Sequence, residues 1–233
     1  MVFLNGVFKT INKYCFFPSV RVTTNRNYHY LLNLTQNVYF SAKHHPMLSN
    51  SIFESKRNSH VKIGELIFWT ATINSWQKLL TGTAYKDIIV NSFTYLSDKG
   101  LVDVFGFVIM PNHIHLIWRV NKLNGKEYPH ASLLKYTAHA LKKSLKATNP
   151  SALASYAVDA KNKQYEFWQR DALEIPLLSR EMAYQKLEYI HNNPLAEHWQ
   201  LATLPEEYYY SSAGFYERNS SPFSFLKDLR NEF

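Results

Sequence analysis

The chain has 233 residues, 46% of them hydrophobic, which is enough for one domain with a well-buried core plus an extension, or for two small domains. Its single cysteine, Cys15, excludes an intramolecular disulfide framework and a cysteine-based zinc site, so histidine, carboxylate and amide groups remain as metal ligands. No segment approaches the ~18 uninterrupted apolar residues of a membrane span, and no signal peptide is recognisable at the N-terminus. We therefore expect a cytoplasmic protein without a membrane partner.

The net charge of +8 is concentrated at the start of the chain. Residues 1–60 hold seven Lys or Arg and one acidic residue, whereas the remaining 173 residues hold 19 basic and 17 acidic ones. The overall charge therefore says little about the body of the protein, and any interaction with DNA has to be argued from local patches.

Residues 1–60 show no regular periodicity and are rich in Asn, Ser and Thr. We interpret them as a poorly defined basic N-terminal extension, or as upstream sequence joined by an early start codon, with Met47 as a later start. The predicted domain covers residues 61–217, and residues 218–233 are predicted to be a C-terminal tail.

A regular pattern begins after Lys62. "ELIFWTATIN" (65–74) is rich in aromatic and β-branched residues and predicts a strand, and "AYKDIIVNSFTYLSDKG" (84–100) has helical spacing with Gly100 as its C-terminal cap. "VDVFGFVIM" (102–110) and "HIHLIWRV" (113–120) predict two strands joined by a tight turn at Pro111 and Asn112.

The second half of the domain begins with an amphipathic helix, "SLLKYTAHALKKSLKA" (132–147). One face carries Lys135, Lys142, Lys143 and Lys146, which are candidate DNA-binding residues, although most basic stripes are simply solvated helix faces. A polar segment (147–164) leads to a fourth strand in "YEFWQRDALEIPL" (165–177). The helix "SREMAYQKLEYIHNNP" follows, with Ser179 as N-cap and Pro194 at its end.

The order strand, helix, strand, strand, helix, strand predicts an α+β fold: a ferredoxin-like split βαβ antiparallel sheet with an added helix. The predicted strand 113–120 carries His113 and His115 on one face, because successive side chains of a strand point to opposite sides. Two imidazoles on one face can hold a metal ion, but they can also be two polar residues on a solvated surface, and the pair is weak evidence by itself.

The last helix places Tyr189 and Asn193 one turn apart on the same face. These can be ordinary surface residues, but together with the histidines they supply what phosphodiester chemistry needs, which is a cation on a phosphate oxygen and an aligned nucleophile. His113 and His115 would hold the cation, Asn193 would add an oxygen ligand, and Tyr189 would be the nucleophile. Mixed imidazole and oxygen ligation suits Mn²⁺ or Mg²⁺.

Two motifs resemble a known family. "FVIMPNHIHLIW" resembles the HUH signature (His, bulky hydrophobic, His) of single-tyrosine transposases of small bacterial insertion sequences. "LEYIHNNPLAEHW" followed by "PEEYYYSSAGFYE" is similar to the downstream signature of the REP-associated tyrosine transposases. The resemblance runs from about Leu66 to Glu217 and leaves the first 60 residues unmatched.

The resemblance implies a metal-dependent enzyme that nicks and rejoins single-stranded DNA near hairpins through a 5′-phosphotyrosine. By position, His113 and His115 match the metal histidines, Tyr189 the nucleophile, and Asn193 the third ligand. Insertion-sequence relatives work as dimers and REP-associated ones as monomers, so either a monomer or a homodimer is expected. The alternatives are a non-catalytic DNA-binding protein domesticated from a transposase, and a metal-dependent hydrolase of small phosphate esters.

Overall fold

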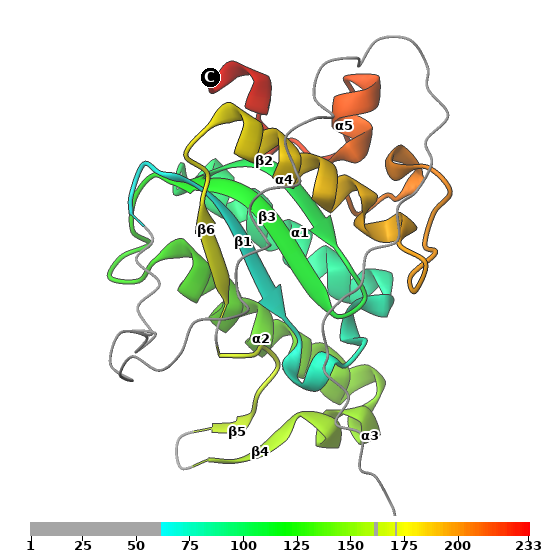
Figure 1. The fold of residues 1–233 in the computed structure, drawn as a ribbon. Coiled ribbons are helices and arrows are strands. Elements are labelled where there is room, and N and C mark those ends of the chain that lie inside the picture. Colours follow the sequence, from blue (N-terminus) through cyan, green and yellow to red (C-terminus); the bar gives the residue numbers. More distant parts are fainter. Residues whose placement is uncertain (1–61, 161–162, 171) are drawn as a thin grey trace, which may run out of the picture. The chain divides into compact units, whose positions relative to one another are not determined.

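The computed structural model describes residues 62–160, 163–170 and 172–233 (Figure 1). The predicted extension, residues 1–60, lies outside this part of the chain. The strands are β1 (Leu66–Thr72), β2 (Val102–Ile109), β3 (His113–Val120), β4 (Ala157–Ala160), β5 (Lys163–Tyr165) and β6 (Leu173–Pro176). The α-helices are α1 (Thr83–Asp98), α2 (Pro129–Thr148), α3 (Pro150–Leu153), α4 (Arg180–Asn192) and α5 (Ala213–Arg218). Short 3-10 turns are η1 (Asn74–Trp76), η2 (Leu79–Thr81), η3 (Ala154–Tyr156), η4 (Asn193–Leu195), η5 (Pro205–Glu207) and η6 (Leu229–Asn231).

The main sheet has the strand order β2-β3-β1-β6, and all of its neighbouring strands are antiparallel. Because β3 lies between β1 and β2, the α1 connection is a split βαβ unit, and the predicted ferredoxin-like α+β fold is confirmed. Ser179 caps α4 as predicted, with its side chain accepting a hydrogen bond from the Met182 amide. Gly100 follows α1 with φ +61°, as the predicted C-terminal glycine requires.

The fourth strand is shorter than the sequence indicates. The prediction covered 165–177, but only Leu173–Pro176 pairs with β1. Phe167 and Trp168 in the first part of that segment are buried, and Trp168 forms only an isolated bridge to Ile73. The aromatic content that suggested a strand therefore reflects core packing. The polar segment 147–164 holds α3 and a β4–β5 hairpin, which the sequence pattern did not reveal.

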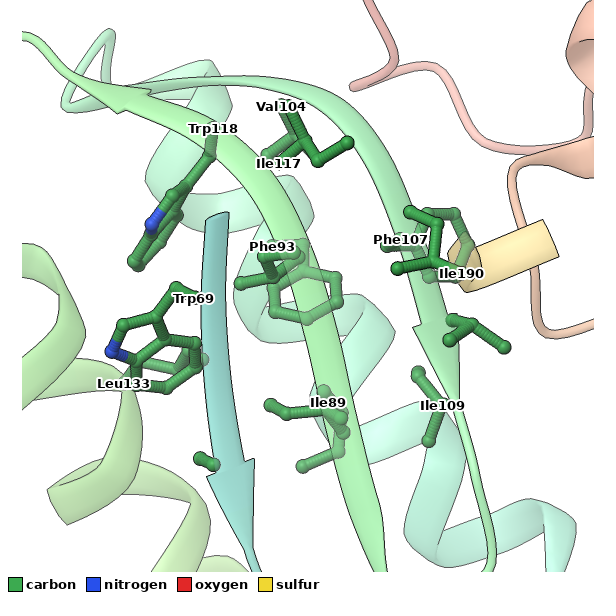
Figure 2. Close-up of a cluster of buried hydrophobic side chains, with 14 of the residues drawn as sticks. Trp69, Ile89, Phe93, Val104, Phe107, Ile109, Ile117, Trp118, Leu133 and Ile190 are labelled. Atoms are coloured by element: carbon green, nitrogen blue, oxygen red, sulfur yellow. The ribbon is translucent and has the colours of Figure 1, made fainter. Parts of the chain in front are cut away.

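The core between the sheet and helices α1 and α2 is aromatic and aliphatic (Figure 2). Trp69 of β1 packs against Trp118 of β3 with ring centroids 5.4 Å apart, and Leu133 of α2 lies beside them. Phe93 of α1 meets Phe107 of β2 edge to face. Since these residues occupy one face of the sheet, the intervening strand residues, including His113 and His115, point to the other face.

Helix α4 covers that second face, over β2 and β3 (Figure 1). The contact is close because β2 has a glycine at the crossing point. A Cβ at Gly106 would lie 2.7 Å from Cδ1 of Leu187 and 3.1 Å from Cδ1 of Ile190. The register of β2 also shifts between Val104 and Gly106, which indicates a β-bulge at this point.

The segment after α4 covers the exposed edge of β2. The Ile109 amide donates to the Tyr210 carbonyl, and the Ser212 amide donates to the Phe107 carbonyl. Residues predicted as a C-terminal tail, 218–233, add the buried side chains of Phe223, Phe225 and Leu229 to the core. Backbone groups of an edge strand that would otherwise remain unpaired are thereby satisfied.

Replacing Gly106 should displace α4. We expect Gly106→Val to lower the free energy of unfolding by about 1–3 kcal/mol, because side-chain atoms of Leu187 and Ile190 occupy the space that its Cβ requires. Urea unfolding followed by circular dichroism measures this. Gly125→Asn is the control, because Gly125 has φ +65° and nothing within 4 Å of its Cβ position. Equal stability of the two variants would contradict the close contact.

Candidate active site

The two histidines of β3 lie side by side on the face that α4 covers. Their ring centroids are 4.6 Å apart, and both side chains are buried, with 8% and 6% exposure for His113 and His115. In the antiparallel pairing of β3 with β1, Thr72 lies opposite His113 and Thr70 lies opposite His115. The solvated-surface alternative is therefore excluded for this pair.

Each histidine is oriented through its Nδ1 atom. His113 Nδ1 lies 2.7 Å from Oδ1 of Asn112, whose amide group also donates to the Trp76 carbonyl at 3.2 Å. Since that amide nitrogen is the donor to Trp76, the Asn112 oxygen accepts from His113 Nδ1–H, and Nε2 of His113 carries the lone pair. His115 Nδ1 forms a 2.7 Å hydrogen bond with the Thr70 hydroxyl. This is the outer-shell support that metal-binding histidines typically have.

Burial keeps both imidazoles neutral. The pKa of His113 is lowered to about 4, mainly by burial and to a smaller extent by the charge of His198. The pKa of His115 is lowered well below its usual range, first by burial and then by the nearby charges of His113 and Lys186. His115 Nε2 is buried and has no hydrogen-bond partner among the described residues. A neutral, buried imidazole nitrogen of this kind is suited to a metal ion.

Tyr189 of α4 reaches the histidine pair. Its ring centroid is 5.4 Å from that of His115 and 6.1 Å from that of Phe68, which itself stacks on His115. The side chain remains 39% exposed, so it is accessible to a large substrate. Lys186, one turn earlier on α4, places its Nζ 5.7 Å from the Tyr189 ring centroid and 5.1 Å from the Phe68 ring centroid. The site therefore combines a phenol, two neutral imidazoles and one cation.

Asn193 follows Tyr189 by four residues and is the half-buried C-cap of α4. The described residues contain no group of three or more His, Cys, Asp or Glu side chains that could hold a metal ion. A metal held by His113 and His115 would therefore take further ligands from an amide such as Asn193 and from water. Because this donor set contains no thiolate, it does not suit a thiolate-binding metal.

The four candidate lysines lie elsewhere. They belong to α2, which packs with α1 on the opposite face of the sheet from His113 and His115. Lys135 forms a salt bridge with Glu127 at 2.9 Å, and Lys142 lies over the Tyr165 ring. Lys143 and Lys146 are exposed on the same helix. The structure does not bring this stripe together with the histidine site.

Several site residues escaped the sequence analysis. Lys186 could have been found, because it precedes Tyr189 by three residues on a predicted helix. Thr70 shares a strand face with Phe68, but nothing in the sequence pairs it with His115. Trp199, whose ring centroid lies 6.1 Å from that of His113, comes from a loop after η4 and has no periodic signal.

No protein-family model and no curated protein matches the sequence. Solved structures that are similar to the chain include the following two. A REP-associated tyrosine transposase bound to a REP hairpin has 16% identity and a TM-score of 0.49, covering 74% of this chain and 91% of its own. A protein of Deinococcus radiodurans described as a predicted transposase has 13% identity and a TM-score of 0.33, covering 55% and 88%. Because both TM-scores are below 0.5, the function has to be argued from the side chains of this chain.

None of the helices in the described ranges is both long and apolar enough to cross a bilayer.

Buried histidine should make the fold sensitive to acid. The pKa of His191 is lowered by burial from 6.5 to about 4, so the unfolded chain takes up a proton that the folded chain does not. Stability is therefore lost as the pH falls from 6.5 towards 4. Between about pH 7 and 4.5, the free energy of unfolding of the wild type should fall by about 2–3 kcal/mol more than that of His191→Gln. Urea unfolding in the presence of EDTA measures both.

The control for this experiment is His139→Gln, since His139 is exposed on α2. Its loss of stability should equal that of the wild type. An equal loss in His191→Gln would show that His191 does not carry the effect.

Proposed function

We propose that the protein is a transposase-type DNA strand transferase that nicks and rejoins single-stranded DNA near hairpins. The observation that carries this proposal is the convergence of Tyr189 with His113 and His115, which come from different layers of the fold. Such a site can align a nucleophile with a phosphate whose charge is neutralised. The accessible ring of Tyr189 suits a polymer substrate better than a small enclosed one.

His113, His115 and Asn193 would hold the metal, which when bound would supply positive charge to a non-bridging oxygen of the scissile phosphate. Tyr189 attacks the phosphorus through its phenolic oxygen and gives up its proton. The bond between phosphorus and the 3′ oxygen breaks, and that oxygen takes up a proton to leave as a 3′-OH. The product is a 5′-phosphotyrosine, which retains the bond energy needed for joining to another 3′-OH.

Lys186 has a supporting role in this proposal. Its ammonium group lies close to Tyr189 and Phe68, so it would add positive charge where the phosphate binds. The DNA-binding assignment of Lys135, Lys142, Lys143 and Lys146 stays a prediction. These residues would have to contact a part of the DNA that passes around to the other layer of the fold.

The nucleophile can be tested directly. Wild-type protein with Mn²⁺ and labelled, hairpin-flanked single-stranded DNA should form a covalent protein–DNA adduct that is visible on a denaturing gel. Tyr189→Phe should reduce the adduct by at least about three orders of magnitude, because only the attacking oxygen is removed. Tyr184→Phe is the matched control, since Tyr184 lies on the same helix and its ring stacks with Arg180 instead.

The other outcomes discriminate between the alternatives. Cleavage that persists in Tyr189→Phe would exclude the assigned nucleophile. DNA binding without an adduct, unchanged by EDTA, would favour a non-catalytic DNA-binding protein. Turnover of a chromogenic phosphodiester without protein-linked DNA would favour a small-ester hydrolase.

The orientation of the histidines provides a test of the metal site. We expect Asn112→Ala to weaken Mn²⁺ binding by about 10–100-fold, because His113 loses the acceptor that fixes its tautomer. His113→Ala and His115→Ala should abolish binding, and His139→Ala should not change it. Isothermal titration with Mn²⁺ measures all four variants. Full affinity in the double variant His113→Ala/His115→Ala would show that the metal binds elsewhere.

A further inference from the structure

An exposed tryptophan lies in the turn directly after β1. Tryptophan has the largest side chain, yet Trp76 is 60% exposed, so its ring contributes little buried apolar surface to the stability of the fold. Its backbone and that of Ser75 are left-handed, with φ of +56° and +55°. Non-glycine residues in this region are strained, and such strain persists where the surrounding structure imposes it. The turn therefore combines an exposed ring with a strained backbone.

The backbone of Trp76 is connected to the candidate active site. Its carbonyl accepts a hydrogen bond from Asn112, the residue whose oxygen accepts from His113 Nδ1. Both ends of the turn are also fastened to the β2–β3 connection. The Ile73 amide donates to the Asn112 carbonyl, and the Leu80 amide donates to the Pro111 carbonyl, each at 2.8 Å. The position of Trp76 is thus fixed relative to His113.

A second aromatic residue and a cation lie close to His113. Trp199 lies 6.1 Å from His113 between ring centroids, and Nζ of Lys78 lies 5.5 Å from the centre of the Trp199 ring. Lys78 is exposed and follows Trp76 by two residues. Exposed aromatic rings beside a basic side chain are how proteins bind unpaired nucleotides, since every base has a face that can stack and every nucleotide has a phosphate.

We propose that Trp76 is a stacking platform for an unpaired base of single-stranded DNA next to the scissile phosphate, and that Lys78 contacts the adjoining phosphate. This inference rests on the proposed function for the identity of the substrate. A base stacked on Trp76 would hold the strand beside His113. The strained turn would then hold the ring exposed to the DNA. The hydrogen bonds that Asn112 makes with the Trp76 carbonyl and with His113 would fix the position of the turn relative to the proposed metal ligands.

The experiment measures binding of fluorescein-labelled oligodeoxythymidylate by anisotropy, in EDTA and in the Tyr189→Phe background so that no chemistry occurs. Trp76→Ala should bind about 5- to 150-fold more weakly, which is the usual cost of removing one stacked base. Trp76→Phe should bind within a few-fold of the parent. Tyr136→Ala is the control, because Tyr136 is 61% exposed on α2, on the other layer.

Two further measurements separate stacking from a structural role. Trp76→Gly should be at least as stable as the parent, because glycine adopts a positive φ without strain, and yet bind as weakly as Trp76→Ala. An abasic oligonucleotide of equal length should bind equally to the parent and to Trp76→Ala. Oligodeoxythymidylate should quench the tryptophan fluorescence of the parent more than that of Trp76→Phe.

Folded Trp76→Ala or Trp76→Gly protein that binds oligodeoxythymidylate like the parent would overturn the inference. The nicking assay fails or succeeds independently of this result. If the wild type nicks DNA and the Trp76 variants bind normally, the platform is wrong and the proposed function stands. If binding depends on Trp76 and no adduct forms, the platform stands and the strand-transfer function is wrong.

Discussion

The close approach of α4 to β2 at Gly106 is the contact on which the site depends. Leu187 and Ile190 occupy the space that any larger residue at position 106 would need. Tyr189 lies between these two residues in the sequence, on the adjoining side of the helix. How closely Leu187 and Ile190 approach the sheet therefore determines how near the Tyr189 ring comes to His115. The packing that stabilises the helix therefore also sets the distance between the proposed nucleophile and the histidines.

The segment that follows α4 supports this contact from the side. Ser212 accepts a hydrogen bond from the Phe107 amide, one residue beyond Gly106, and its hydroxyl lies 2.8 Å from Nε2 of His191 on α4. Tyr216 donates to the Phe105 carbonyl on the same strand. The residues "YYYSSAGFYE" therefore have a physical role that is separate from chemistry. They close the edge of β2 and connect it to the helix that carries Tyr189.

A buried lysine secures the other end of this segment. Lys86 of α1 donates to the Tyr208 hydroxyl at 3.0 Å and lies over the Tyr208 and Tyr210 rings. Burial lowers its pKa, while Asp87 acts in the opposite direction. The aromatic rings and the hydroxyl compensate the ammonium group for part of its lost hydration. Both helical layers are thus joined through residues 208–216, and neither layer can shift without breaking a buried polar contact.

Strand and helix periodicity accounts for the parts of the site that the sequence predicted. Alternation along 113–120 places His113 and His115 on one face, and a helical turn separates Tyr189 from Asn193. Periodicity assigns a residue to a face of its own element but not to a layer of the fold. That is why the sequence could identify the α2 lysines as candidate DNA-binding residues without showing that they lie on the other layer. The partners Thr70 and Asn112 depend on strand pairing and turn geometry, which no local pattern contains.

The burial of the histidine pair links the stability of the fold to its proposed chemistry. Burial lowers the pKa of each imidazole, so both offer lone pairs at neutral pH without competition from protons. A buried polar nitrogen without a partner costs about 1–3 kcal/mol, and His115 Nε2 has no partner within residues 62–160, 163–170 and 172–233, so this atom would weaken the fold that positions it. A cation that binds only the folded state would offset this cost, by an amount that grows with the logarithm of its concentration relative to its dissociation constant. The same atoms would then govern metal affinity and acid sensitivity, so a substitution of His113 or His115 would change both.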